Sequence, residues 1–231
     1  MENEQRNIDF ATIIASAVHD MKNSLSMLLN YLDDVVDYFK EINVPEAVQL
    51  THLHYEAKRV NNNLIQLLSL YRLDKSMYSL NVTYNSVNEL LNDLVIQNKT
   101  MLDYKNITVE TECEDDLFWF FDLDMISGVL NSTMNNSFRY TKSKLRLVAE
   151  VEDGYLKISI EDDGGGYPKS LIDATSDHRD KSIDFCSGST GLGLYFAEIV
   201  ADFHTNKNKK GYISLCNGCT LGGGCFSLYL P

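Results

Sequence analysis

Near the start of the chain, the stretch AVHDMKNSLSMLL at positions 17–29 contains three polar side chains that can take part in chemistry. His19 comes one position after an apolar residue of a helical pattern, so its ring should project from the helix flank, where other molecules can reach it. Asn23 lies four residues on and shares that face, while Asp20 adjoins the ring. Imidazole exchanges a proton near neutral pH, which makes this histidine a candidate functional group.

A second candidate site is rich in glycine. The segment ISIEDDGGGYP ends a predicted strand on acidic residues and three glycines, and GSTGLGLYFAEIVADFH opens a predicted helix with a glycine-rich turn. Glycines at the start of a helix let backbone N–H groups approach an anion closely, and the positive end of the helix dipole favours phosphate there. This pattern is typical of a site for a triphosphate.

The histidine must be carried by a long helix. Apolar residues follow alternating steps of four and three from Ile14 to Phe39, and a second seam of this kind runs from Leu53 to Tyr71. Between them, EINVPEA contains Pro45 at a position suited to a tight turn. Two long helices joined by a short loop pack antiparallel, but each keeps half of its seam uncovered. We therefore predict a homodimeric four-helix bundle formed by residues of about 7–75.

The remaining sequence indicates a mixed α/β domain. Helices are predicted over 87–104 and 123–140, and strands at ITVETE, LFWFF, KLRLVAEVE and YLKISIED, with YISLCNG and CFSLYLP as a closing hairpin. We expect two domains, residues 1–78 and residues 79–231.

Composition narrows the classes of function. The chain has 33 acidic and 20 basic residues, and no basic cluster that would neutralise a run of phosphates, so nucleic acid is not an expected partner. No apolar run approaches the roughly 18 residues needed to span a bilayer, and MENEQRNIDF lacks the features of a signal peptide. We expect no membrane insertion and a cytoplasmic location. Five irregularly spaced cysteines suit a reducing compartment.

The order of the motifs HDMKN, NNSFRYT, DDGGGYP and GSTGLGL resembles the transmitter core of the two-component sensor histidine kinases over nearly the whole chain. That family joins a dimerisation and histidine-phosphotransfer hairpin to an ATP-binding α/β sandwich of the GHKL (Bergerat) type. The resemblance implies ATP and Mg²⁺ as cofactors. It also implies that the protein phosphorylates itself and passes the phosphoryl group to an aspartate of a response regulator receiver domain.

The resemblance assigns His19 as the residue that attacks the γ-phosphate, with Asp20 taking a proton from the other ring nitrogen. In VLNSTMNNSFRYT it assigns Asn136 as the Mg²⁺ ligand, with Asn135 as the one-residue alternative. The further roles it implies are contact with the phosphates for Arg139 and lining of the adenine pocket for Tyr140.

By the same resemblance, Asp162 accepts a hydrogen bond from the adenine amino group, and Gly164 and Gly166 keep the adjoining loop open. The second glycine box supplies phosphate contacts through its backbone and two hydroxyl groups, and its residues are Ser189, Thr190, Gly191, Leu192, Gly193 and Leu194. The stretch from Lys169 to Gly188 falls where the family has a mobile ATP lid.

Four positions depart from the family pattern. Ser132 stands where many relatives have an earlier asparagine, Ser189 replaces a glycine, and Phe185 is the only remnant of a phenylalanine box. Ser24 replaces a common proline, so little kinking of the first helix is expected.

Two alternative functions stay open. One is net phosphatase activity toward the regulator, since Asp20-Met-Lys-Asn23 resembles the family's acidic-x-x-Asn/Thr pattern. The other is a non-catalytic phosphotransfer or docking module. Because the predicted bundle begins almost at Met1, we expect the signal to come through a separate sensor protein, the dimer itself or the lid.

The CNGC segment from Cys216 to Cys219, with Cys225 nearby, also has metal-ligand character. No fourth ligand falls at a recognised spacing, and Asn-Gly is a strong turn signal, so a plain turn is the favoured interpretation. The other histidines, including His204 at a helix end, are expected at the surface, and KNKK at 207–210 is expected to be a solvated loop.

Overall fold

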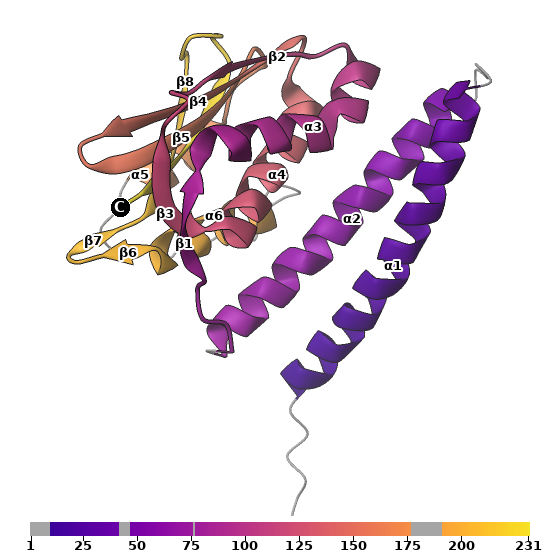
Figure 1. Ribbon diagram of the computed structural model, residues 1–231, viewed down its shortest axis with the longest axis horizontal. Coiled ribbons are helices and arrows are strands. Elements are labelled where there is room, and N and C mark those ends of the chain that lie inside the picture. The colour runs from indigo at the N-terminus through magenta and orange to yellow at the C-terminus, as the bar shows by residue number, and fades with distance from the viewer. Residues whose placement is uncertain (1–9, 42–46, 76, 177–190) are drawn as a thin grey trace, which may run out of the picture. The chain divides into compact units, whose positions relative to one another are not determined.

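The computed structural model describes residues 10–41, 47–75, 77–176 and 191–231. The chain divides into two compact units, Met1–Tyr78 and Ser79–Pro231. The first is a pair of long helices and the second is an α/β domain (Figure 1). None of the helices in these ranges combines the length and the apolar character needed to cross a lipid bilayer.

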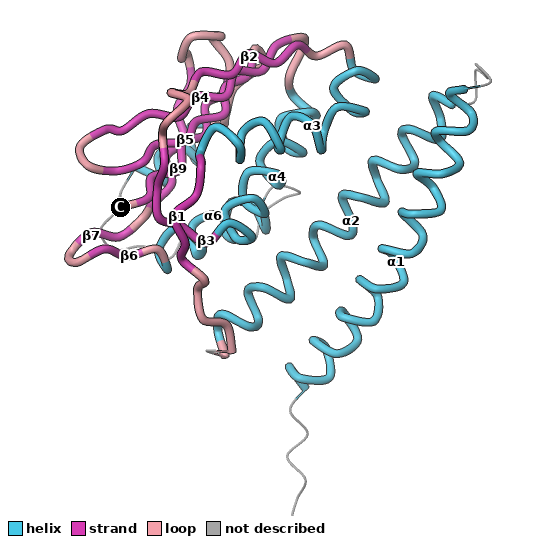
Figure 2. The backbone as a smooth tube through the Cα atoms, viewed as in Figure 1, coloured by secondary structure: helices cyan, strands magenta, loops and turns pink. Residues whose placement is uncertain are grey.

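The first unit consists of α1 (Phe10–Glu41) and α2 (Ala47–Asp74), which lie side by side and antiparallel (Figure 2). Helix α1 is continuous through Ser24, whose hydroxyl donates to the carbonyl of Asp20 at 3.0 Å. The expectation of little kinking at this position therefore agrees with the helix observed.

The most buried apolar side chains of α1 in the described residues lie beside the predicted seam and not in it. Leu29 and Val36 are 8% and 2% exposed. Each of them follows directly after a seam residue that is much more exposed. These seam residues belong to a set spaced seven residues apart whose side chains are 38–56% exposed: Ile14, Met21, Leu28 and Val35. A single partner helix covers less than the full width of such a stripe. The hairpin thus presents a row of apolar side chains to its surroundings.

The second unit is built on a five-stranded sheet in the order β2-β4-β5-β9-β8. Strands β2 and β4 are parallel, and the other pairs are antiparallel. The bounds of the sheet strands are β2 (Thr108–Glu112), β4 (Lys144–Glu152), β5 (Tyr155–Asp162), β8 (Tyr212–Asn217) and β9 (Gly224–Leu230).

Helices α3, α4 and α6 lie on one face of this sheet, which gives a two-layer sandwich (Figure 2). The apolar core between the layers includes the fully buried Phe138, Leu147, Ile158, Phe196 and Phe226. The helices of the domain are α3 (Val87–Lys105), α4 (Leu123–Tyr140), α5 (Lys169–Ser176) and α6 (Gly191–Phe203). This architecture confirms the predicted helical hairpin followed by an α/β sandwich.

Two small sheets complete the domain. Strands β1 (Val82–Ser86) and β3 (Phe118–Asp122) pair antiparallel and lead into α3 and α4. Strands β6 (Thr205–Asn206) and β7 (Lys209–Lys210) form a short hairpin. The KNKK stretch was predicted to be a loop, and that prediction was wrong in part. Lys207 adopts a φ of 54° at this tight turn and so lets the two short strands meet.

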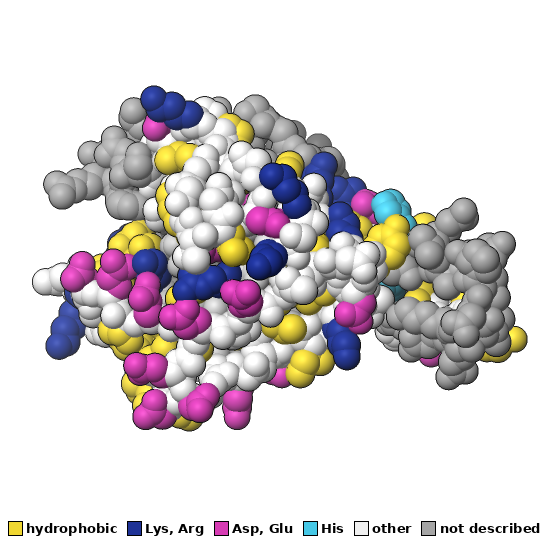
Figure 3. Space-filling view, turned by 90° about the horizontal axis from the view of Figure 1, so that it is seen from above, with side chains coloured by type: hydrophobic (Ala, Val, Ile, Leu, Met, Phe, Trp, Pro, Cys, Tyr) yellow, Lys and Arg dark blue, Asp and Glu magenta, His cyan; other side chains and the backbone are white. Residues whose placement is uncertain are grey.

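The surface of the described residues mixes charges of both signs. On the face in Figure 3, acidic and basic side chains are interspersed. Arg146 pairs with Glu112 and Glu161, and Lys157 lies 3.0 Å from Glu150. Such pairs balance charge locally, and the net charge of −13 is the surplus of acidic over basic residues in the whole sequence.

His204 is buried, 3% exposed, so the expectation of a surface histidine was wrong. Its Nδ1 donates to the Val200 carbonyl at 2.7 Å, and its Nε2 accepts from the Asp122 backbone N–H at 3.1 Å. Both ring nitrogens are therefore used by the neutral form. Burial lowers the pKa of His204, and this effect outweighs the opposing hydrogen bond to Val200 and the charge of Asp122.

We expect this neutral histidine to make the stability of the α/β domain depend on pH. Because the pKa is lower in the folded state, the unfolded chain binds the proton first as the pH falls. The free energy of unfolding should decrease below about pH 6.5, by up to roughly 1.4 kcal/mol per pH unit, until the folded pKa is reached.

The test is urea unfolding followed by fluorescence of Trp119, the only tryptophan, at about pH 7.5 and about pH 5.5. His204→Gln should show a smaller loss between the two conditions than the unaltered protein. His52→Gln, at an exposed position of α2, is the control and should behave like the unaltered protein. Equal losses in all three proteins would contradict the assignment.

Candidate functional site

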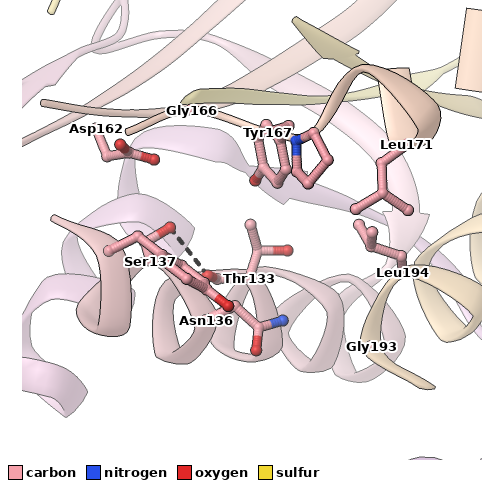
Figure 4. A pocket seen from close by; sticks show the side chains of 11 residues that line it. Thr133, Asn136, Ser137, Asp162, Gly166, Tyr167, Leu171, Gly193 and Leu194 are labelled. Carbon is pink, nitrogen blue, oxygen red and sulfur yellow. Dashed lines mark hydrogen bonds between the residues drawn. The ribbon is translucent and has the colours of Figure 1, made fainter. Parts of the chain in front are cut away.

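The α/β domain contains a cavity of about 190 Å³ between α4, the loop after β5, α5 and the first turn of α6 (Figure 4). Its lining residues are Thr133, Asn136, Ser137, Tyr140, Asp162, Gly166, Tyr167, Pro168, Leu171, Gly193 and Leu194. These residues come from segments that are far apart in the sequence.

Helix α4 contributes one face to the cavity. Its lining residues follow Thr133 by three, four and seven positions, so they project from the same side of the helix. The Thr133 hydroxyl donates to the Val129 carbonyl at 3.0 Å, and the Ser137 hydroxyl donates to the Thr133 carbonyl at 3.1 Å. The half-buried amide of Asn136 also lies on this face (Figure 4). Asn135 is buried and does not line the cavity.

Asp162 ends β5 and is 6% exposed. Its Oδ1 accepts the backbone N–H of Gly164 at 2.7 Å and that of Gly224 at 3.2 Å. In Figure 4 its carboxylate faces the open space between the sheet edge and α4. The two N–H groups replace part of the hydration that burial removes, so a charged group is held at the cavity wall.

Tyr167 forms a second part of the wall. The backbone of this residue is held by Asn217 in β8, whose Oδ1 accepts from the Tyr167 N–H at 2.7 Å and whose Nδ2 donates to the Tyr167 carbonyl at 2.9 Å. Burial raises the pKa of the Tyr167 phenol, and the charge of Asp162 raises it further. The phenol therefore stays neutral at physiological pH.

Gly193 lets α6 approach α4 closely. A Cβ atom at this position would lie 2.8 Å from the Ser132 hydroxyl and 3.1 Å from Nδ2 of Asn136. The first turn of α6 can therefore meet the polar face of α4 without a side chain between them. The beginning of a helix offers unpaired N–H groups and a partial positive charge, which suit an anion.

Six residues predicted from the sequence motifs line the cavity, namely Asn136, Tyr140, Asp162, Gly166, Gly193 and Leu194. Four others do not. Gly164 lies in the adjoining loop, Gly191 and Leu192 lie in the first turn of α6, and Arg139 is exposed with its guanidinium 5.9 Å from the Tyr140 ring. Ser189 and Thr190 are outside the described residues.

The sequence reasoning missed five lining residues: Thr133, Ser137, Tyr167, Pro168 and Leu171. Helical spacing from Asn136 and Tyr140 was a usable signal for the first two. Leu171 belongs to the stretch expected to form the mobile lid. The first eight residues of that stretch form α5. The Thr175 hydroxyl of α5 accepts a hydrogen bond from the Leu215 backbone N–H of β8 at 3.3 Å. The rest of that stretch, including Phe185, lies outside the described residues.

His19, Asp20 and Asn23 lie exposed on α1, in the helical hairpin. Nδ1 of His19 is 3.4 Å from Nδ2 of Asn23 and 3.6 Å from Oδ1 of Asp20. Both contacts involve Nδ1, so within the described part of the chain Nε2 is the ring nitrogen left to meet an incoming group. With the ring proton on Nδ1, on the side of Asp20, the lone pair is on Nε2, and this tautomer suits a histidine that reacts through Nε2; the Asn23 amide would donate to Nδ1 only in the other tautomer.

No family model matches the chain. Among characterised proteins, the sensor protein SrrB of Staphylococcus aureus is 24% identical over 209 residues, which are 87% of this chain and 35% of that protein. The chain thus spans about a third of the length of this relative.

Solved structures with a similar fold include the histidine kinase AdeS of Acinetobacter baumannii, with a TM-score of 0.59 and 20% identity over 92% of this chain and 96% of that one. The catalytic domain of the histidine kinase ThkA has a TM-score of 0.54 and 21% identity, over 66% of this chain and 96% of that one.

The α/β domain therefore has the fold seen in the ThkA structure, and a helical hairpin precedes it in the chain. The sequence relatives and the structural neighbours together confirm the resemblance to the transmitter core of the sensor histidine kinases.

We expect Gly164→Ala to distort the wall of the cavity. A Cβ at this position would lie 2.4 Å from the Tyr140 carbonyl oxygen and 2.7 Å from Oδ1 of Asp162. Backbone atoms must move to relieve such contacts, so the free energy of unfolding should fall by roughly 1–3 kcal/mol.

The matched control is Gly165→Ala, because nothing lies within 4 Å of a Cβ at that neighbouring position. Its effect should stay within about 0.5 kcal/mol. Urea unfolding of the two variants, measured side by side, checks the difference. Similar losses in both would show that the close approach at Gly164 does not limit the structure.

Proposed function

We propose that the chain is an ATP-dependent histidine kinase that phosphorylates itself on His19 and passes the phosphoryl group to an aspartate of a response regulator. One observation carries this proposal. Asp162, Asn136 and Gly193 belong to three separate motifs, and all three line the same cavity. An exposed histidine on a separate helical hairpin supplies the acceptor.

The chemistry of the cavity suits the adenine of ATP. The Asp162 carboxylate can accept a hydrogen bond from the adenine amino group, while its Oδ1 keeps the two backbone partners. The neutral Tyr167 ring, Tyr140, Leu171 and Leu194 offer apolar surface to a flat base. A mostly apolar cavity with a few fixed polar groups is typical of a small-molecule site.

The residues present also fit Mg²⁺. The half-buried Asn136 offers an amide oxygen, a ligand type that Mg²⁺ prefers, and Gly193 leaves space beside this amide where a Cβ would intrude. Mg²⁺ would there neutralise charge on the phosphates. We propose that the start of α6 at Gly191, the Arg139 guanidinium, and Ser189 and Thr190 contact the phosphates.

In the proposed reaction, Nε2 of His19 attacks the γ-phosphorus, an N–P bond forms, and the bond to the leaving ADP oxygen breaks. A proton on Nδ1 leaves the Nε2 lone pair free for this attack. Asp20, whose Oδ1 lies 3.6 Å from Nδ1, holds that proton in place and can accept it as the product forms.

We further propose that the protein is a homodimer. On α1 the exposed apolar set recurs every seven residues, and on α2 a similar set is 44–54% exposed: Leu53, Val60 and Leu67. Pairing two hairpins through these rows would remove them from water and complete a four-helix bundle. A separate sensor protein and a cytoplasmic location remain part of the proposal.

A second activity is proposed for Asn23. Its amide lies one helical turn from His19, with Nδ2 3.4 Å from Nδ1 of the ring. When a regulator docks there, the amide could orient water toward the phospho-aspartate. Orientation and charge stabilisation dominate phosphoryl transfer, so an amide suffices for this role.

We expect Asp162→Asn to weaken ATP binding. Asparagine keeps one oxygen for the two backbone N–H groups but replaces the other with an amide donor, which opposes the adenine amino group. The loss of this hydrogen bond should reduce affinity roughly five- to a hundredfold. Binding of a fluorescent ATP analogue measures this change.

The matched control for this change is Asp153→Asn. It removes the same charge from the turn between β4 and β5, at a backbone φ of 52° that asparagine tolerates well. Affinity for the analogue should be unaltered. If Asp162→Asn also binds normally, the adenine site lies elsewhere.

With Mg²⁺ and γ-labelled ATP, we expect an acid-labile, base-stable label on His19. His19→Gln should abolish the label, because no other described histidine is exposed beside an acidic residue with an amide side chain four residues on. Binding of the ATP analogue should persist in this variant. His52→Gln is the exposed control and should label normally. Full labelling of His19→Gln would refute the assignment.

Adding a response regulator to this assay separates the two activities. A labelled regulator that loses its label faster with unaltered protein than with Asn23→Ala supports the phosphatase role. ATP binding without any label on the protein would favour a different acceptor or a docking function.

A further inference from the structure

We propose that Cys216, Cys219 and Cys225 form a binding site for a thiophilic divalent cation, with Zn²⁺ as the ion expected. The sequence favoured a plain turn here because no fourth ligand has a recognised spacing. The folded chain brings the three sulfur atoms within 4.8 Å of one another, and those of Cys216 and Cys219 are 3.2 Å apart. This cluster is separate from the nucleotide cavity.

Sheet register explains how the cluster forms. Cys216 of β8 lies opposite Cys225 of β9, so both side chains project from the same face. Cys219 belongs to the turn that joins these strands. In that turn Gly218 has φ +81° and its N–H donates to the Gly223 carbonyl at 3.0 Å, which closes the loop. The turn thereby brings its cysteine back over the strand pair.

The spacing of the sulfur atoms suits tetrahedral zinc. With Zn–S bonds of about 2.3 Å, two thiolates on one ion lie roughly 3.8 Å apart. The sulfur atoms of Cys216 and Cys219 are 3.2 Å apart and every pair in the cluster lies within 4.8 Å, so small movements of side chains would complete the geometry. Zinc binds cysteine as the thiolate, so zinc binding would release a proton from each thiol that coordinates as its thiolate forms.

Glu161 is the candidate fourth ligand by sheet register, and its carboxylate would have to move toward the three sulfur atoms to share an ion with them. It lies opposite Cys225 on the neighbouring strand β5 and so shares the face of the cluster. The residue is 6% exposed, and among the described residues its Oε2 has no hydrogen-bond partner. Its other oxygen, Oε1, lies 3.0 Å from a guanidinium nitrogen of Arg146. A buried carboxylate oxygen in this position is stabilised by coordination to a cation.

Arg146 makes the charge of such a site tolerable. Three thiolates and a carboxylate around Zn²⁺ carry a net charge of −2. Arg146 of β4 lies opposite Glu161 in the sheet, so its guanidinium places a positive charge beside this group. The same guanidinium donates to the Thr220 hydroxyl at 3.1 Å, one residue after Cys219. Arg146 therefore connects the turn that carries Cys219 to the acid of the neighbouring strand.

A metal ion at the cluster would fix the hairpin that supports the cavity wall. Asn217, which follows Cys216, holds the backbone of Tyr167, and Gly224, which precedes Cys225, donates to Asp162. Zinc binding should therefore stabilise the folded α/β domain, because the unfolded chain lacks this arrangement of ligands.

The test uses full-length protein in which Cys113 and Cys186 are both replaced by serine, so that the cluster supplies the only thiols. The reduced protein is titrated with Co²⁺ in the presence of a non-thiol reductant, and Zn²⁺ then competes. We expect one Co²⁺ per chain with a thiolate-to-cobalt charge-transfer band, displacement of the ion by Zn²⁺, and a higher unfolding temperature with Zn²⁺.

Cys216→Ser is the most informative variant, because this exposed residue can be replaced without loss of core packing. It should lower zinc affinity at least about a hundredfold. Cys219→Ser should do the same, and Glu161→Gln should weaken binding less than either. Circular dichroism establishes that each variant is folded.

Three results would overturn the proposal. The first is the absence of a charge-transfer band in folded, reduced protein, and the second is equal zinc affinity in the serine variants. The third is an air-oxidised protein whose mass is lower by two hydrogen atoms, a change that Cys219→Ser abolishes, together with no metal binding after reduction. That result would make the cluster a disulfide-forming pair instead of a metal site.

Discussion

The cavity of the α/β domain depends on how the buried carboxylate of Asp162 is satisfied. Its Oδ1 accepts N–H groups from Gly164, two residues along the chain, and from Gly224, at the start of β9. A buried charge needs hydrogen bonds to replace lost water. Meeting that need ties the loop after β5 and the turn before β9 to one point, and these two segments carry much of the cavity wall.

Close approach of backbone to backbone is the second constraint at this point. The Gly223 N–H donates to the Asp162 carbonyl at 3.1 Å, and a Cβ at Gly223 would lie 2.3 Å from that oxygen. Gly193 has a similar function at the start of α6, where a side chain would collide with Ser132. The glycines of the motifs therefore serve packing at least as directly as they provide open space for a ligand. This dual use explains why glycine-rich boxes alone are weak evidence for phosphate binding.

Features encoded locally were predictable from the sequence. The predicted helix over 123–140 matches α4, since apolar periodicity and the capping Asp122, which accepts the Met125 N–H at 3.0 Å, act within one turn. Features that depend on distant contacts were not. The burial of His204 requires a partner 82 residues away, and the position of Tyr167 requires Asn217. The apolar seam of α1 was visible, but which flank α2 covers depends on how the two helices pack.

In the proposed reaction, the two units differ in how firmly their reacting groups are held. Asp162 and Ser137 of the cavity are buried and already fixed by hydrogen bonds, so the proposed nucleotide would need little rearrangement of them. The His19 ring is instead exposed, and the contacts described for it come from its own helix. Because positioning supplies much of the catalysis in phosphoryl transfer, the rate should depend on how often this ring reaches the bound nucleotide. An input that alters helix packing can therefore control phosphorylation without changing the affinity for ATP.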